Sequence, residues 1–222
     1  MREAVIPAYM GLITQIDDQI GRLVRYLEDS GQSDEVLIVF TSDHGDYLGD
    51  HWLGEKELFH DASARIPLIV MDPSGAADAT RGTVNHDLTE AIDLVPTFVE
   101  WLGGKVPDHI LEGYSLLPAL HGQCAVPRAF AVSEYDYSAR PHLRHLSPDA
   151  KHCGLTMIFD GRWKMVWVEG HRPMLYDLET DPDEFHDLGD SPAHQPQVKR
   201  LTRLMLQWTR RQHNRVTISD ER

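Results

Sequence analysis

The stretch VLIVFTSDHGDYLGDHWLGEK, residues 36–56, joins an uninterrupted apolar run to a polar turn that contains aspartate, histidine and glycine. The apolar run is β-branched and aromatic, which is typical of a strand buried on both faces in a parallel sheet. Asp43 and His44 would then follow its carboxyl end, where open α/β sheets place their ligand sites. The two glycines after them permit a tight turn and a close approach of backbone. The alternative is a polar turn that binds nothing.

The segments around this stretch have the order of an α/β layered domain. Apolar residues spaced three and four apart predict a long amphipathic helix over roughly 4–29. A second buried strand is expected at 67–71, paired with 36–41 in the sheet, and a helix at about 89–102. The residues expected on the inward face of that helix are Ile92, Val95, Phe98 and Val99. We assign residues 1–125 to this α/β domain.

The pattern changes after residue 125, where short strands follow one another and indicate a small antiparallel α+β subdomain at 126–222. Asp160-Gly161 is expected to form a two-residue hairpin turn. Trp163 and Trp167 are expected to pack on a sheet face. The predicted strands cover 129–135, 154–159, 163–168 and 174–178, and a closing helix covers 197–211.

Composition excludes several classes of partner. With 35 Asp and Glu against 21 Lys and Arg, the formal net charge is −14, so nucleic acid and anionic membrane surfaces are not expected to bind. No apolar run has the length of a membrane span, and the first residues do not resemble a signal peptide. Cys124 and Cys153 have no metal-binding spacing and are expected to be free thiols in a reducing compartment. The expected location is the cytoplasm.

Asp43 and His44 offer a carboxylate oxygen and an imidazole from adjacent positions. This pair suits a divalent cation but does not choose among Mg²⁺, Ca²⁺, Mn²⁺ and Zn²⁺. Lys56 follows thirteen residues after Asp43, and a cation beside an ammonium is what a tetrahedral oxyanion needs. His60 would share a helix face with Lys56 if a helix began there, which makes it a catalytic candidate with a structural role as the alternative. Arg65 is expected to pair with a buried carboxylate.

The run VFTSDHGDYLGDHWLGEKELFHDASARIPLIV, residues 39–70, resembles the second metal-ligand segment and downstream lysine of the sulfatases, within the alkaline-phosphatase superfamily. The flanking segments are most similar to the phosphonate monoester hydrolase branch, and the resemblance covers essentially the whole chain. Those segments are AYMGLITQIDDQIGRL, EAIDLVPTF, LEGYSLLP, SEYDYS, GRWKMV and MLYDLETDPDEFHDLG.

The resemblance implies an alkaline-phosphatase-like α/β sheet segment covered by helices, with about half of a metal site in residues 1–125. It also implies that Asp43 and His44 ligate a divalent cation. Lys56 would contact the non-bridging oxygens of a small sulfate, phosphate or phosphonate ester, which the enzyme would hydrolyse. Both catalytic and substrate-binding roles are thereby expected of Lys56.

The nucleophile of this family is a formylglycine made from the cysteine of a Cys-x-Pro-x-Arg motif. In this chain Cys124 is followed by proline at the third position instead of the second, and it lies downstream of the metal segment. We therefore expect no nucleophile here. The resemblance places the formylglycine and the first metal-binding aspartate in a preceding N-terminal part of a longer enzyme.

Two alternatives to this hydrolase stay open. One is a non-catalytic remnant or interaction subunit that keeps the fold. The other is a two-metal phosphodiesterase or mutase of the same superfamily, although either would need further Asp and His ligands and no second spaced set is evident. The chain supplies few neighbours for its strand at 36–41, essentially 67–71 and at most also 129–135. It is therefore expected to expose a sheet edge, and hence to associate as a two-fold homodimer.

Overall fold

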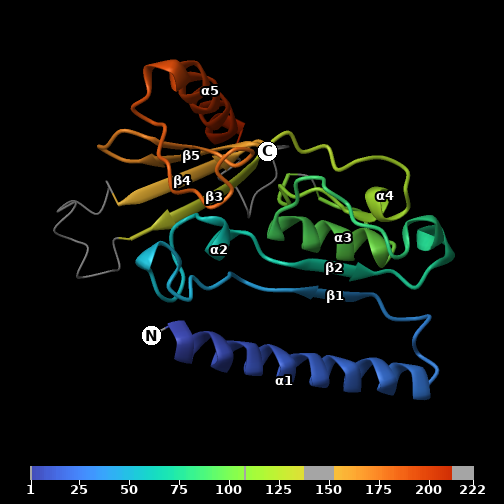
Figure 1. Ribbon diagram of the computed structural model, residues 1–222. Helices are drawn as coiled ribbons and strands as arrows, with labels where there is room; N and C mark the ends of the chain where they lie inside the picture. The colour runs from blue at the N-terminus through green and yellow to red at the C-terminus, as the bar shows by residue number, and fades with distance from the viewer. Residues whose placement is uncertain (1, 108, 138–152, 212–222) are drawn as a thin grey trace. The chain divides into compact units, whose positions relative to one another are not determined.

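The computed structural model describes residues 2–107, 109–137 and 153–211 (Figure 1). The chain forms two compact units, Met1–Thr83 and Val84–Arg222. These units differ in extent from the expected domains, whose boundary at 125–126 stays a prediction. Among the described residues, no helix combines the length and the hydrophobicity that crossing a membrane requires.

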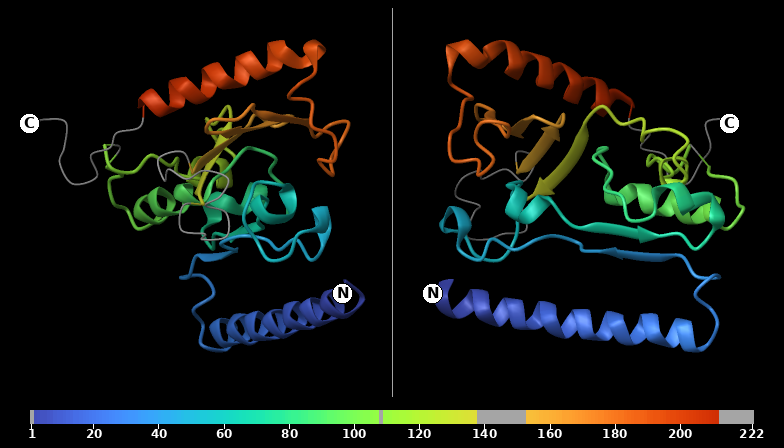
Figure 2. Two further views of the ribbon diagram at one scale, coloured as in Figure 1. Left: turned by 90° about the vertical axis from the view of Figure 1, so that its left-hand side faces the viewer. Right: turned by 45° about the vertical axis from the view of Figure 1, so that its right-hand side comes forward.

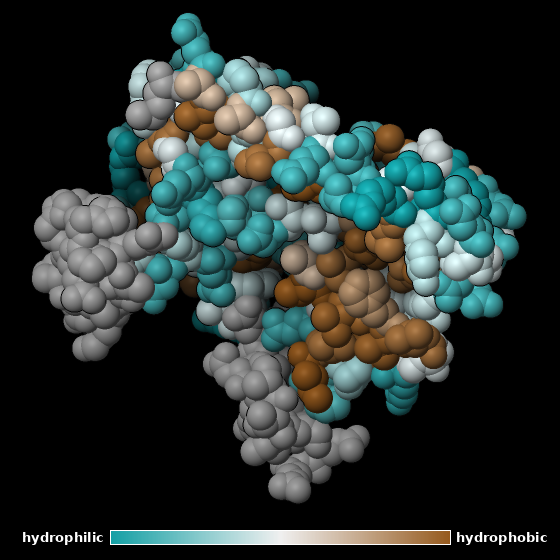
Figure 3. All heavy atoms as spheres, turned by 90° about the horizontal axis from the view of Figure 1, so that it is seen from below, coloured by the Kyte–Doolittle hydropathy of each residue, from teal (hydrophilic) through white to brown (hydrophobic). Residues whose placement is uncertain are grey.

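The first unit begins with the predicted long helix, α1 (Arg2–Asp29). Gly31 follows at φ +72°, and the amide of Gln32 donates to the carbonyl of Leu27, which closes the last turn. Leu27 is the one buried residue of this helix. Large hydrophobic side chains are exposed in both units, and Figure 3 shows such side chains gathered on the face seen from below. The exposed large hydrophobic residues of α1 are Val5, Met10, Leu12, Ile13, Ile16, Leu23 and Tyr26.

The two predicted strands of the first unit form and pair with each other, but their orientation corrects our expectation. β1 (Ile38–Thr41) and β2 (Leu68–Met71) run antiparallel, with Ile38 opposite Met71 and Thr41 opposite Leu68 (Figure 1). Neither is buried on both faces, since Phe40 of β1 is 37% exposed and Ile69 of β2 is 62% exposed. An apolar run reads alike in either orientation, and here the intervening chain returns against the direction of β1. Three short elements complete the unit, namely η1 (Asp50–Trp52), α2 (Asp61–Ala64) and η2 (Gly75–Thr80).

In the second unit, the helix expected at 89–102 is a 3₁₀ turn, η3 (Ala91–Asp93), continued by α3 (Leu94–Trp101). The predicted inward face is wrong. Ile92, Val95 and Phe98 are exposed and Val99 is half-buried, whereas the buried side is formed by Asp93, Pro96 and Thr97. Asp93 and Thr97 are buried because they make hydrogen bonds there, which hydrophobicity alone does not reveal.

The antiparallel sheet predicted after residue 125 is confirmed, in the order β3-β4-β5-β6. α5 (Gln195–Arg211) covers the sheet and shares its core with it (Figure 2). Trp163 and Trp167 pack against that core as expected. The hairpin turn contains Asp160 and Gly161 but also Arg162, so it is longer than predicted. The strands are β3 (Ala131–Asp136), β4 (Gly154–Phe159), β5 (Trp163–Val168) and β6 (Met174–Asp177), and the remaining helical turns are α4 (Leu117–Leu120) and η6 (Pro192–His194).

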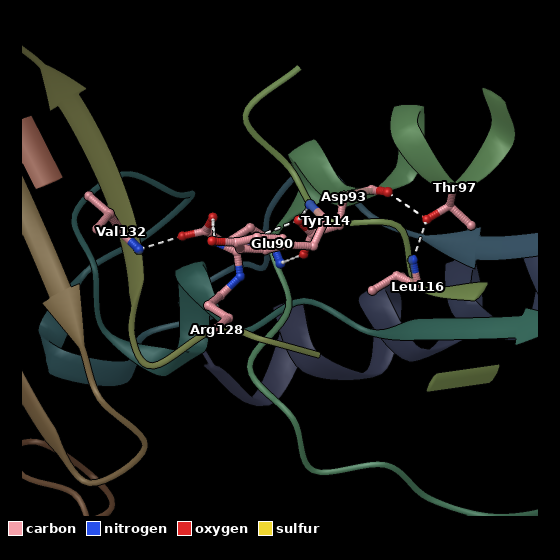
Figure 4. Close-up of polar contacts among 7 residues, drawn as sticks. All are labelled: Glu90, Asp93, Thr97, Tyr114, Leu116, Arg128 and Val132. Carbon is pink, nitrogen blue, oxygen red and sulfur yellow. Dashed lines mark hydrogen bonds and ion pairs between the residues drawn. The ribbon is translucent and has the colours of Figure 1, made fainter. Parts of the chain in front are cut away.

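A buried ionic network ties η3 to the loop before β3 (Figure 4). Arg128 bonds to the carboxylates of both Glu90 and Asp93. Glu90 also accepts the amide of Val132 at 2.5 Å, and Asp93 accepts the amide of Tyr114 at 2.8 Å. Burial raises the pKa of the Glu90 carboxyl, an effect that the Val132 amide and Arg128 oppose and the Asp93 charge reinforces. Arg128, which follows Cys124 by four positions, is therefore a structural residue.

A second buried ion pair fastens the segment after β6 to the sheet. Lys164 of β5 and Glu184 are each 2% exposed, and their Nζ and Oε1 atoms lie 2.7 Å apart. A lysine can be buried this deeply because a carboxylate compensates its charge. Glu184 adopts φ +56°, a left-handed conformation that is uncommon outside glycine.

Candidate metal and anion site

The turn after β1 holds Asp43 and His44 in a compact arrangement within the first unit. The Oδ1 atom of Asp43 accepts the backbone amide of His44 at 3.0 Å. The hydroxyl of Ser42 donates to the carbonyl oxygen of His44 at 2.7 Å. These two bonds fold the backbone over the pair, so that adjacent side chains, which diverge along a strand, lie on the same side.

Gly45 is required at this turn because another backbone segment passes directly over it. Its amide donates to the carbonyl of Ser63 at 2.8 Å. A Cβ built on Gly45 would lie 2.0 Å from the carbonyl oxygen of Ala62, far inside van der Waals contact. The predicted close approach of backbone is thereby confirmed, and it links the Asp43–His44 turn to α2.

The tautomer of His44 follows from its neighbours. Its Nδ1 atom lies 2.7 Å from the carbonyl oxygen of Gly45, and because a carbonyl only accepts, Nδ1 carries the proton. Nε2 therefore presents a lone pair. Lys56 Nζ donates to that nitrogen at 2.8 Å, and Asp43 Oδ2 lies 3.3 Å from it. The structure thus brings together Asp43, His44 and Lys56, which the sequence predicted as site residues.

The electrostatics of Asp43 favour its ionised form. Desolvation acts to raise the pKa of this carboxyl, but the hydrogen bond from the His44 amide and the nearby Lys56 ammonium oppose it, and the pKa is lowered. Asp43 is mostly exposed, with 81% of its side chain accessible. The site is therefore open to solvent and carries a carboxylate at neutral pH.

These donors fit a divalent cation as two of its ligands. An ionised carboxylate and an imidazole lone pair are both common ligands, and a protonated Nδ1 bonded to a carbonyl is the usual support for a ligating Nε2. Within residues 2–107, 109–137 and 153–211, no group of three or more His, Cys, Asp and Glu side chains is arranged to hold a metal. A metal at Asp43 and His44 would need the Lys56 ammonium to move off the Nε2 lone pair.

His60 does not share a helix face with Lys56, because residues 55–60 are not helical and α2 begins only at Asp61. Instead, Nδ1 of His60 lies 2.9 Å from the hydroxyl of Tyr47. The ring of His60 stacks on that of His51, with centroids 3.9 Å apart. Sequence reasoning left Tyr47 and His51 unassigned. Their spacing from Lys56 shows no regular period, so nothing in the pattern could have singled them out.

The sequence also singled out Arg65 and the two cysteines. Arg65 pairs with Asp61 at 3.6 Å, but the arginine side chain is 82% exposed and the carboxylate only partly buried, so the expected buried pair is not formed. Cys124 and Cys153 are free thiols, the first exposed and the second buried. Cys124 lines a cavity of about 610 Å³ in the second unit, together with Lys105 and Tyr114.

Comparison with known proteins identifies relatives over nearly the whole chain. The sulfatase family model matches residues 2–104. The multifunctional alkaline phosphatase superfamily protein PehA of Trinickia caryophylli is 39% identical over 206 residues, which are 90% of this chain and 39% of that protein. The chain therefore spans well under half the length of this relative.

Two solved structures share the fold. The phosphonate monoester hydrolase of Silicibacter pomeroyi superposes with a TM-score of 0.84 at 32% identity, covering 96% of this chain and 43% of that one. The phosphonate monoester hydrolase of Agrobacterium radiobacter gives 0.81 at 36% identity, covering 92% and 41%. These likenesses confirm the α/β, alkaline-phosphatase-like fold class. Residues 2–104 thus match the sulfatase family, and over nearly its whole length the chain is homologous to members of the alkaline-phosphatase superfamily that include phosphonate monoester hydrolases.

Proposed function

We propose that this chain contributes the Asp43, His44 and Lys56 part of a metal-dependent hydrolase of sulfate, phosphate or phosphonate esters. The observation that carries the proposal is the 2.8 Å contact of Lys56 Nζ with His44 Nε2 beside Asp43. The contact brings one carboxylate, one imidazole and one ammonium together, and once the ammonium leaves the Nε2 lone pair these groups can hold a cation and an oxyanion side by side. The names of the relatives, a sulfatase family and two phosphonate monoester hydrolases, support the same ester class.

In this proposal each residue has a distinct task. Asp43 and His44 hold a divalent cation, which when bound would polarise an oxygen of the ester group. Lys56 places its ammonium against a non-bridging oxygen and so stabilises negative charge that grows during ester cleavage. The nucleophile, expected to be a formylglycine, would come from residues other than these three. The identity of the cation is Mn²⁺, Ca²⁺, Mg²⁺ or Zn²⁺.

Calorimetric titration of the full chain with Mn²⁺ and with Ca²⁺ tests the cation half of the proposal. We expect weak but measurable binding, since two protein ligands do not complete a site. Asp43→Ala/His44→Ala should abolish it. The matched control is His186→Ala, because His186 Nδ1 lies 3.4 Å from Asp181 in a comparable Asp–His pair. Equal binding by the parent and the double variant would exclude the assignment.

The anion half is tested with inorganic phosphate added to the Mn²⁺-loaded chain. We expect Lys56→Met to weaken phosphate binding about tenfold, equivalent to about 1.4 kcal/mol. The non-catalytic alternative predicts instead that neither cation nor phosphate binds at these residues. Absence of both binding events in the parent would therefore favour that alternative over the hydrolase.

A further inference from the structure

The loop that carries Lys56 has an unusual backbone. Between residues 48 and 58, six residues other than glycine adopt positive φ angles. Such conformations are disfavoured for residues with a Cβ, and they persist only where surrounding contacts over-determine them. The six are Leu48 at 48°, His51 at 51°, Trp52 at 58°, Glu55 at 59°, Glu57 at 88° and Leu58 at 57°.

Backbone hydrogen bonds hold the start of this loop against the segment that leads to Lys56. The amide of Tyr47 donates to the carbonyl of Glu55 at 2.9 Å, and the amide of Gly49 donates to that of Leu53 at 2.9 Å. Glu55 is the neighbour of Lys56 in the chain. The position of Tyr47 therefore sets the backbone from which the Lys56 side chain departs.

Three aromatic rings then join the two ends of the loop. Tyr47 is fully buried, and its hydroxyl lies 2.9 Å from Nδ1 of His60. His60 stacks on His51 at 3.9 Å between ring centroids, with 17° between the ring planes. Tyr47 meets both imidazoles edge to face, with centroids 6.3 Å from His51 and 5.7 Å from His60. Each ring thus contacts the other two, an arrangement that favours one geometry of the loop.

We infer that Tyr47, His51 and His60 are positioning residues that hold the backbone of Lys56 within reach of His44 by locking the strained loop between them. None of the three is assigned a contact with cation, anion or substrate. Their effect reaches Lys56 through the Tyr47–Glu55 hydrogen bond and through the fixed ends of residues 48–58. The inference rests on the proposed function, because the position of Lys56 matters to catalysis only if Lys56 binds an oxyanion.

The test uses the imidazole ¹⁵N resonances of the full chain in long-range ¹H–¹⁵N correlation spectra. His44→Gln assigns the His44 Nε2 signal, and Lys56→Met gives its value once the ammonium is absent. We expect Tyr47→Phe and His60→Ala to move this signal most of the way toward the Lys56→Met value. His60→Asn should restore it, because an amide group can meet the Tyr47 hydroxyl where Nδ1 does. Tyr26→Phe, which removes an exposed hydroxyl from the same unit, is the matched control.

An unchanged His44 signal in both Tyr47→Phe and His60→Ala would overturn the inference. Loss of folding by Tyr47→Phe, seen by circular dichroism, would overturn it too, since the hydroxyl would then serve global stability. Phosphate titration of the parent and Lys56→Met is independent of this readout. If the His44 signal moves as expected but phosphate binding does not depend on Lys56, the proposed function fails and the positioning role stands.

Discussion

The ammonium of Lys56 lies 2.8 Å from Nε2 of His44, so it occupies the position where a divalent cation would meet its imidazole ligand. The two cations would compete for one lone pair unless an anion lies between them. Removing the Lys56 ammonium should therefore change the affinity for a cation and the affinity for an anion in opposite directions.

Lys56→Met is therefore expected to tighten Mn²⁺ binding while it weakens phosphate binding. Removing the ammonium frees the lone pair and removes a repulsion, which solvent screening reduces because Lys56 is exposed. We expect Mn²⁺ to bind about threefold more tightly, or about 0.6 kcal/mol. Calorimetry measures the affinities for Mn²⁺ and for phosphate. The control variant is Lys105→Met, which changes an exposed lysine of the second unit. A variant that loses affinity for Mn²⁺ would contradict the competition.

Gly45→Ala is expected to destabilise the first unit strongly. Its Cβ would lie 2.0 Å from the Ala62 carbonyl oxygen, so the backbone of one segment has to move. Overpacking of this kind costs about 1–3 kcal/mol, or more where backbone is the obstacle. Gly54→Ala is the control, because nothing lies within 4 Å of the Cβ there. Urea unfolding should separate the two variants, and equal midpoints would show that residues 45 and 62 are not in contact.

Glu184→Gln is expected to lower the free energy of unfolding by about 3–5 kcal/mol, because it removes the carboxylate charge that lies 2.7 Å from the buried Lys164 ammonium. The double variant Lys164→Met/Glu184→Gln should recover most of this loss, since no charge is then buried. A double-mutant cycle from urea unfolding gives the coupling energy. If the double variant is as unstable as the sum of the single ones, the two residues do not act as a pair.

Two carboxyls of the second unit should respond to pH in opposite directions. The pKa of Glu90 is raised above its ordinary value of 4.5, mainly by desolvation. Its contribution to stability is therefore present below about pH 4.5 and is lost as pH rises through the raised pKa. The pKa of Asp177 is lowered below 3.8, mainly by hydrogen bonds from Arg162. Its contribution is present above about pH 3.8 and is lost as pH falls through the lowered pKa.

Urea unfolding across this pH range, for the parent, Glu90→Gln and Asp177→Asn, measures both slopes. In the parent, the free energy of unfolding should decline as pH rises through the raised pKa of Glu90. Glu90→Gln should not show this decline. Asp177→Asn should remove a loss of stability on acidification. Profiles that stay parallel to that of the parent would show that neither carboxyl titrates differently in the folded and unfolded chains.

The 222-residue chain by itself is expected to associate through exposed hydrophobic side chains. On α1, Ile16 and Leu23 are 53% and 54% exposed and lie seven residues apart, on one side of the helix. Ile16→Lys/Leu23→Lys should therefore shift light scattering toward the monomer mass, whereas Gln15→Lys should not. A parent that is monodisperse and monomeric at high concentration would contradict the expected two-fold dimer.

The sequence by itself determined most of the elements and the main residues of the site. The spacing of apolar residues located α1, β4, β5 and α5 to within two residues, because the period of the backbone sets that spacing whatever the neighbouring elements are. Asp43, His44 and Lys56 were recognisable from their type and spacing, and Gly45 from the need for a close approach of backbone.

Tertiary structure alone decided three other features. The antiparallel pairing of β1 with β2 depends on how the intervening chain returns, and an apolar strand does not encode its direction. The buried face of α3 is set by hydrogen bonds of Asp93 and Thr97, which outweigh the hydrophobicity of Ile92 and Phe98. The contacts among Tyr47, His51 and His60 arise because a strained loop folds back on itself, and contacts of that kind have no period in the sequence.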